Sequence, residues 1–219
     1  MATVLITGSD TGIGLELARQ LAQRGDDVVA TCIASSAALS ALPVRVIEGV
    51  DVTSDAAVHQ LGVTLAGLPL DMLINNAGVF AQETLDTLDF DGMRRHYEVN
   101  ALGPLRVTAA LRPNLRRGAK VAIVSSRVGS IGDNASGANY GYRASKAAVN
   151  MIGVNLAHDL RPAGVAVALL HPGAVATAMN GGVGIPVAEA VEGLLARIDA
   201  LTLAESGGFW HANGMRLPW

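Results

Sequence analysis

The chain of 219 residues has one cysteine, Cys32. A single cysteine excludes an internal disulfide and any metal site built from several thiolates. Histidines are also few, and they form no compact metal-ligand pattern, so we expect structural or surface roles for them and no bound metal. They are His59, His96, His158, His171 and His211.

Net positive charge and long apolar runs are missing as well. A formal net charge of -3 gives no electrostatic reason to expect nucleic acid or an anionic membrane. Basic residues gather at Arg94-Arg95 and from Arg112 to Lys120, where acidic neighbours and helical periodicity favour a solvated face. No apolar run approaches the ~18 residues of a membrane span. The chain opens directly with the strand-like run Thr3–Thr7 and no signal-peptide pattern. We therefore expect a cytoplasmic protein.

Aromatic residues are scarce, at 4%, although half of the residues are hydrophobic. The apolar content is mainly alanine, valine, leucine and isoleucine, together with 25 glycines. This mixture suits helices packed closely on a buried parallel sheet. The length fits one domain, and no repeat, linker or low-complexity tract divides the chain. We predict a single domain over residues 1–219.

Short apolar runs alternate with amphipathic helical segments along the chain. The expected strands are Thr3–Thr7, Asp27–Cys32, Val44–Glu48, Asp71–Asn75, Lys120–Ser125 and Val165–Leu170. The expected helices are Ile13–Arg24, Ser54–Leu65, Phe90–Leu111, Tyr142–Leu160 and Val187–Leu201. Such repeated βαβ units predict an α/β fold, a doubly wound parallel sheet with helices on both faces. At the C-terminus we expect a last strand near Gly208, then a turn at Asn213-Gly214 and a short segment that runs back along the strand.

Three segments lie where an open α/β sheet binds ligands. The turn Thr7-Gly8-Ser-Asp-Thr-Gly12-Ile-Gly14 joins the first strand to the first helix. Its glycines permit close approach of a pyrophosphate to the helix N-terminus, although the spacing departs from the common Gly-x-Gly-x-x-Gly pattern. Without a ligand it would simply be a glycine-rich turn. The loops from Ser126 to Tyr140 and from Pro172 to Pro186 also follow strands.

Tyr142 and Lys146 are four residues apart on a predicted helix, so they are neighbours on one face. A lysine charge beside a tyrosine favours the phenolate and lowers a pKa that is otherwise near ~10. Such a tyrosine can exchange a proton with an alcohol or carbonyl oxygen. By itself the spacing is weak, but Ser126 lies sixteen residues upstream of Tyr142.

Taken together, these motifs resemble the short-chain dehydrogenase/reductase superfamily over essentially the whole chain. The matching landmarks are Thr7-Gly-x-x-x-Gly12-x-Gly14, Asp51-Val52, Asn75-Asn-Ala-Gly78, Asn100, Ser125-Ser126, Tyr142-x-x-x-Lys146, and Pro172-Gly173 followed by Thr177. The stretch from Ser125 to Lys146 and the terminal Leu-Pro-Trp219 look most like the small carbonyl reductases related to C-factor and Sniffer. The resemblance implies a Rossmann-type fold and interconversion of a ketone or aldehyde with an alcohol.

The resemblance also implies roles for four catalytic residues. Tyr142 would be the general acid or base, and Lys146 would lower its pKa and hydrogen-bond the nicotinamide ribose. Ser126 would hold the substrate oxygen. Asn100 would support a water that links Lys146 to solvent; otherwise it is simply a polar helix residue. The adjacent Ser125 is the less favoured candidate, because strand alternation points the two serines in opposite directions.

The implied cofactor is NAD(H) or NADP(H). The positions expected to contact it are Gly8, Asp10, Thr11, Gly12, Ile13, Gly14, Cys32, Ile33, Asp51, Val52, Asn76, Ala77, Gly78, Tyr142, Lys146, Pro172, Gly173, Val175 and Thr177. The end of the second strand carries Cys32-Ile33, neither the acidic residue typical of NAD enzymes nor the arginine typical of NADP enzymes. The lack of cations and the negative charge of Asp10 disfavour the 2′-phosphate of NADP, whereas Ser35 and Ser36 could donate neutral hydrogen bonds to it. The missing cations matter more than the two neutral donors. We therefore lean slightly to NAD.

The expected substrate is a modest apolar ketone or its secondary alcohol. Its pocket would be lined by Val79-Phe80 and by the two later loops, which carry Val128, Ile131, Met179 and Val183. Arg127 and Arg143 are the charged exceptions. The alternatives are a nucleotide-binding signalling protein with little turnover and a non-redox lyase on the same scaffold. The resemblance further implies a homodimer or homotetramer.

Overall fold

The computed structural model describes all 219 residues, 1–219. Its centre is a seven-stranded sheet in the order β3-β2-β1-β4-β5-β6-β7, and every neighbouring pair is parallel. The strands are β1 (Thr3–Thr7), β2 (Asp27–Thr31), β3 (Arg45–Ile47), β4 (Leu70–Asn75), β5 (Leu115–Val124), β6 (Ala166–His171) and β7 (Gly208–His211). The predicted Rossmann-type sheet is confirmed.

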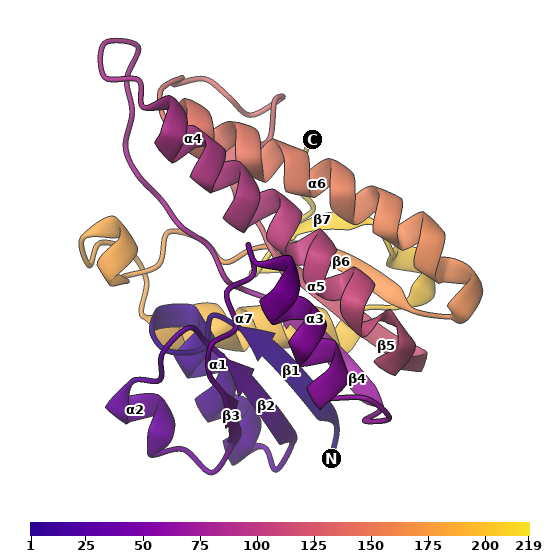
Figure 1. Cartoon of the computed structure of the whole chain (residues 1–219). Coiled ribbons are helices and arrows are strands. Elements are labelled where there is room, and N and C mark those ends of the chain that lie inside the picture. Colours follow the sequence, from indigo (N-terminus) through magenta and orange to yellow (C-terminus); the bar gives the residue numbers. More distant parts are fainter.

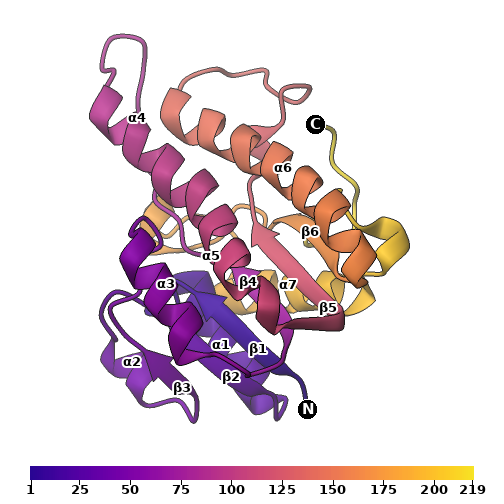
Figure 2. The same ribbon diagram turned by 45° about the vertical axis from the view of Figure 1, so that its right-hand side comes forward.

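Helices cover both faces of this sheet (Figures 1 and 2). One face carries α3 (Asp55–Thr64), α4 (Phe90–Tyr97), α5 (Gly103–Leu111) and α6 (Tyr140–Leu160), and the other carries α1 (Gly12–Gln23), the short α2 (Ala37–Ser40) and α7 (Val187–Ala200). The strands supply alternate side chains to the two cores. In β1, Leu5 packs into the core under α3 and α5, whereas Val4 and Ile6 pack under α1 and α7.

The structure corrects two details of the sequence prediction. The strand β5 begins at Leu115, so Arg116 and Arg117 lie on an exposed strand end and not on a helix face. A bulge between β4 and β5 accompanies this early start. The long helix from Phe90 to Leu111 contains a π-helical turn, η1 (Glu98–Leu102), ahead of Pro104. None of the helices is long and apolar enough to cross a membrane.

The chain reverses direction across the sheet between β1 and β4. From β1 the strand order runs outward to β2 and β3, and from β4 it runs the other way to β5, β6 and β7. At such a switch point the loops leaving adjacent strands part, and ligands bind in the crevice beyond the carboxyl ends. The segments that leave β1, β5 and β6 all begin at this edge, because the strands are parallel. The fold therefore brings the three predicted site segments together.

Candidate active site

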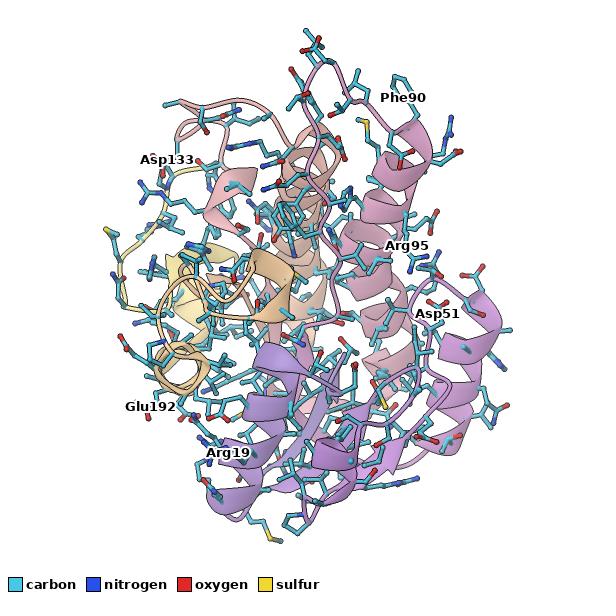
Figure 3. All side chains as sticks on the ribbon, turned by 90° about the vertical axis from the view of Figure 1, so that its left-hand side faces the viewer. Arg19, Asp51, Phe90, Arg95, Asp133 and Glu192 are labelled. Atoms are coloured by element: carbon cyan, nitrogen blue, oxygen red, sulfur yellow. The ribbon has the colours of Figure 1, made fainter.

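A cavity of about 870 Å³ occupies the crevice at the carboxyl edge of the sheet. Every residue predicted from the sequence to contact cofactor or substrate oxygen lines it, apart from Gly14 and Asn100. Figure 3 looks into this edge of the molecule: Asp51 and Arg95 lie close together on one side, and Asp133 lies on the far side. The cavity therefore has two ends, one beside α3 and α4 and one beside the loop from Ser126 to Tyr140.

The glycine-rich turn forms the floor of the first end. Gly8 has φ +65°, and a Cβ there would lie 2.8 Å from Ala77 Cα. Gly14 lies behind the turn, where a Cβ would overlap Gly8 O and lie 2.5 Å from Asn76 Nδ2. That amide donates to Thr7 O at 3.1 Å and to Gly8 O at 2.9 Å. Gly14 thus acts by letting α1 pack against the turn, and it does not line the cavity.

The N-terminus of α1 opens toward the same end. Its N-cap residue, Thr11, makes no side-chain hydrogen bond to the helix. The first-turn N–H groups of a helix have no intrahelical acceptor. These donors, together with the positive end of the helix dipole, favour an anionic group at this position.

Lys146 and Tyr142 meet inside the cavity. Lys146 Nζ lies 5.7 Å from the centre of the Tyr142 ring and donates to Val124 O at 2.9 Å. The lysine is only 5% exposed, and this burial lowers its pKa to about 8. A buried ammonium is costly, so the backbone carbonyl of β5 is an important partner for it.

The pKa of Tyr142 is raised above its ordinary value, first because the phenol is buried, while hydrogen bonding with Ser126 acts in the opposite direction. Lys146 Nζ lies over the tyrosine ring and is bonded to Val124 O. The expectation that Lys146 lowers this pKa stays a prediction.

The two candidate serines have different environments. Ser125 Oγ donates to Asn150 Oδ1 at 2.6 Å, and both residues are buried. Ser126 Oγ accepts only a long contact from Val128 N–H, at 3.4 Å, and it is the serine that influences the Tyr142 pKa. The geometry favours Ser126 as the hydroxyl available to a ligand.

Asn100 lies in the π-helical turn η1 and is buried. Its Oδ1 accepts from Val79 N at 2.8 Å, and its Nδ2 donates to Val79 O at 3.0 Å and to Ser145 Oγ at 3.0 Å. These bonds join the segment after β4 to α6. The structure places no direct bond between Asn100 and Lys146, so its predicted link to the lysine stays a prediction.

The cavity is also lined by Cys32 and Ile33, the positions expected to distinguish NAD from NADP. The Ile33 side chain is 65% exposed. Cys32 is buried, and desolvation, Asp10 and Glu48 all raise the pKa of its thiol. Glu48 Oε1 accepts from Ser35 N at 2.7 Å. Glu48 was missed in the sequence because it follows a different strand, β3, and only the parallel pairing of β2 and β3 brings it here.

The hydroxyls of the neighbouring serines are already engaged. Ser36 Oγ donates to Asp10 O at 2.7 Å and accepts from Leu39 N at 3.1 Å as the N-cap of α2. Ser35 Oγ pairs with Ser40 Oγ at 2.8 Å. Nearby, Asp51 accepts two hydrogen bonds from Thr53, first from its backbone N–H, which lower the pKa of the Asp51 carboxyl.

The second end of the cavity is lined by Phe80, Val128 and Met179, as predicted, whereas Ile131 and Val183 lie outside it. Arg127 and Arg143 both line it, and Arg127 Nε pairs with Asp133 at 2.6 Å. His171 was predicted to be an ordinary residue, but it also lines the cavity. Burial lowers the pKa of His171 to about 4, so the ring is neutral at physiological pH.

Comparison with known proteins places this arrangement in a family. Residues 2–185 match the family described as short chain dehydrogenase. The chain belongs to the short chain dehydrogenase family. It is 48% identical over its full length to the 1-hydroxy-2-glutathionyl-2-methyl-3-butene dehydrogenase of Rhodococcus sp. (strain AD45), all of which is covered. It is 47% identical to the C-signal protein of Myxococcus xanthus, over 69% of this chain and 93% of that protein.

Solved structures agree with the family assignment. NADPH-bound carbonyl reductase from chicken fatty liver superposes with a TM-score of 0.91 at 29% identity, covering 100% of this chain and 99% of the other. The carbonyl reductase Sniffer of D. melanogaster gives 0.91 at 26% identity, with both chains fully covered. The resemblance to the C-factor and Sniffer group is confirmed, and the family member described here is an oxidoreductase.

Proposed function

We propose that the protein is an NAD(P)(H)-dependent oxidoreductase that interconverts an alcohol with its aldehyde or ketone. The observation that carries this proposal is the convergence of Ser126, Tyr142 and Lys146 on one cavity with the glycine-rich turn of β1 and α1. The residues fit a nicotinamide dinucleotide. The uncapped start of α1 suits a pyrophosphate, and Asp51 and Val52 lie at the adenosine end.

The bound nicotinamide supplies or accepts the hydride. Ser126 donates a hydrogen bond to the substrate oxygen and holds it beside Tyr142. In oxidation, Tyr142 Oη takes the hydroxyl proton of the alcohol; in reduction, it returns a proton to the carbonyl oxygen. Lys146 holds positive charge next to the phenol and stabilises it as a phenolate, an effect that strengthens as water leaves the site.

For the cofactor we propose NAD(H). The surroundings of Cys32 and Ile33 contain the carboxylates of Asp10 and Glu48 and no cation, so a 2′-phosphate would meet repulsion and no ionic partner. Of the cations that line the cavity, Arg95 lies at the same end, where its charge acts on the Asp51 carboxylate, and Arg127, Arg143 and Lys146 belong to other parts of it. The chicken carbonyl reductase was solved with NADPH, so this choice distinguishes the chain from that relative.

Calorimetric titration of the purified protein tests the cofactor choice. We expect NAD+ to bind at least about tenfold more tightly than NADP+, a difference of about 1.4 kcal/mol. Ile33→Arg should reduce this preference by about tenfold, since a charged hydrogen bond adds about 1.5–3 kcal/mol. Val63→Arg is the matched control, because Val63 is also exposed but lies on α3 outside the cavity. Tighter binding of NADP+ by the unaltered chain would contradict the choice.

For the substrate we propose an alcohol that carries a bulky thioether, of the kind that gives the Rhodococcus dehydrogenase its name. The second end of the cavity joins apolar contacts from Phe80, Val128 and Met179 with the guanidinium groups of Arg127 and Arg143. Apolar walls suit a hydrocarbon carbinol, and guanidinium groups suit the carboxylates of a glutathionyl group.

The function is tested by following absorbance of the reduced nicotinamide with a small panel. We expect the protein to reduce NAD+ with a glutathionyl alcohol. NAD+ reduction should be slower with the analogue in which a methylthio group replaces the glutathionyl group. In the other direction, we expect apolar ketones to be reduced as NADH is oxidised. The proposal fails if no alcohol reduces either cofactor and no carbonyl compound oxidises it. Tight nucleotide binding with no turnover would favour the second candidate, a nucleotide-binding signalling protein, which the similarity to C-signal supports.

The rate of alcohol oxidation should rise with pH in the alkaline range. Oxidation needs the phenolate of Tyr142, whose pKa burial raises, whereas reduction needs the phenol and should fall over the same range. Ser126→Ala removes the hydrogen bond that lowers this pKa, so the pH range over which the rate of alcohol oxidation rises, the rising limb of the profile, should move to higher pH. Ser125→Ala, which loses only the bond to Asn150, should leave the limb in place. The pH profiles of kcat for both variants provide the check.

We also propose a homodimer or homotetramer. The outer surfaces of α4 and α6 carry the large apolar side chains Phe90, Tyr97 and Met151, which are 62%, 46% and 63% exposed. An exposed apolar patch of this kind favours association. Light scattering from the purified protein should give at least twice the chain mass of 22.5 kDa. A monomeric mass at micromolar concentration would contradict the proposal.

A further inference from the structure

Glu83 and His96 are a buried pair of titratable residues that have no part in the proposed proton transfer. Glu83 ends the extended segment Val79–Glu83, which follows β4 and which we call the strap; His96 lies on α4. The two side chains are 3% and 2% exposed. Glu83 Oε1 and His96 Nδ1 face each other at 3.4 Å, and neither atom has a hydrogen-bond partner. A buried carboxylate and imidazole are costly unless they satisfy each other.

The other nitrogen of His96 fixes the proton position of the ring. His96 Nε2 accepts the backbone N–H of Ala81 at 2.9 Å. A ring nitrogen that accepts carries no proton, so in the neutral imidazole the proton is on Nδ1 and points to Glu83 Oε1. The ring of His96 therefore holds the strap by a hydrogen bond at Ala81 and lies against it at Glu83.

Glu83 also binds the start of α6, the helix that carries Tyr142. Its Oε2 accepts the N–H of Gly141 at 3.0 Å. Its backbone O accepts from Asn139 N at 2.8 Å, and its N donates to Asn139 Oδ1 at 3.3 Å. Asn139 is the N-cap of α6, but its side chain makes no capping bond to the helix. Glu83 therefore supplies, from a distant part of the chain, the acceptor that an N-cap side chain usually provides.

The strap presses an aromatic side chain against Tyr142. At its first residue, both backbone groups of Val79 are bonded to Asn100. Between Val79 and the points held by His96, the Phe80 ring meets the Tyr142 ring edge-to-face, with centroids 4.9 Å apart and an interplanar angle of 81°. The His96 ring lies 6.0 Å from the same tyrosine, also edge-to-face. Tyr142 thus has the strap on one side and Ser126 at its hydroxyl.

We propose that Glu83 and His96 are positioning residues that fasten the strap to the first turn of α6 and so hold the Tyr142 phenol in its reacting geometry. The inference rests on the proposed acid–base role of Tyr142. Neither residue lines the cavity, and the strap makes no contact with the glycine-rich turn in the hydrogen bonds described. Loosening the strap should therefore lower kcat and leave nucleotide affinity unchanged.

The first test compares three variants of the full-length protein. Glu83→Ala should lower kcat by at least about tenfold, because small displacements of a reacting group can cost about 10²-fold, with the Kd for NAD+ unchanged within about twofold. Glu83→Gln keeps one amide oxygen that can accept Gly141 N–H, but its NH2 group cannot accept from His96 Nδ1–H, so it should recover only part of the rate. The matched control is Asp86→Ala, which removes an exposed carboxylate between β4 and α4. Full activity of Glu83→Ala would overturn the inference.

A double-mutant cycle separates positioning from a general loss of structure. If Glu83 acts through Tyr142, Glu83→Ala should cause little further loss in a Tyr142→Phe background. An equal proportional loss in both backgrounds would contradict positioning. If Glu83→Ala does not fold, His96→Met replaces it in the double-mutant cycle with Tyr142→Phe, because methionine has a volume similar to that of histidine. If the Tyr142→Phe single variant retains full activity, the proposed function has failed. If Tyr142→Phe is impaired but Glu83→Ala retains full activity, the inference about Glu83 has failed and the proposed function stands.

Discussion

Tyr142→Phe is expected to lower kcat by about 10³-fold, within the range contributed by general acid–base catalysis, while the protein still folds and binds NAD+. Phenylalanine retains the ring that packs against Phe80 at 4.9 Å and loses only the hydroxyl that exchanges a proton with the substrate. Steady-state rates with the best alcohol of the panel, together with calorimetric binding of NAD+, measure the two parts of this expectation.

Tyr140→Phe is the matched control for this variant. Tyr140 lies two residues earlier on the same helix, is 41% exposed and does not line the cavity. Its hydroxyl has no role in the proposed chemistry, so the rate should stay within about twofold of the parent. A Tyr142→Phe enzyme within a few-fold of the parent would show that the phenol is not the proton donor and acceptor.

Gly14→Ala is expected to destabilise the fold by about 3 kcal/mol, the upper end of typical overpacking costs, and to weaken NAD+ binding by at least about tenfold. The new Cβ would overlap Gly8 O and crowd Asn76 Nδ2 at 2.5 Å. Since both groups are fixed by hydrogen bonds around the turn, α1 must move away from it. Thermal unfolding should show a fall in Tm of about 6–12 °C for a chain of this length.

Gly62→Ala tests whether the effect of Gly14→Ala comes from this close approach. Gly62 lies inside α3, where a Cβ would meet Ala110 O at 3.4 Å and Ala110 Cβ at 3.9 Å, both ordinary contacts. Alanine is also the better helix former. Stability and NAD+ affinity should be unchanged or slightly improved. A Gly14→Ala protein with the parent's Tm and affinity would contradict the described packing.

Much of the sheet could be predicted from the sequence because its strands are buried on both faces and read as short apolar runs. The run Thr3–Thr7 coincides with β1. The beginning of β5 was missed because Arg116 and Arg117 are exposed and polar there. The π-helical turn Glu98–Leu102 has no periodic signal of its own, and it forms inside a helix that was otherwise predicted correctly.

The motif residues of the site were predicted mainly because they match the landmarks of the family in their order along the chain, and only the glycine-rich turn and the Tyr142–Lys146 spacing gave a signal of their own. Two features could not be found in this way. Glu48 reaches Cys32 only through the pairing of β2 with β3. Glu83 and His96 meet across a loop and a helix, and their burial depends on the start of α6. No local pattern in the sequence distinguishes these three from ordinary surface residues.

In the proposed reaction, Tyr142, Ser126 and Lys146 serve a direct hydride transfer between a carbinol carbon and a nicotinamide. The most direct measurement uses a glutathionyl alcohol with deuterium on its carbinol carbon, incubated with NAD+ and the protein. We predict that mass spectrometry finds the deuterium in the reduced nicotinamide, and that Tyr142→Phe slows its arrival by about 10³-fold. Oxidised product formed without deuterium in the nicotinamide, or equal transfer by Tyr142→Phe, would contradict this account.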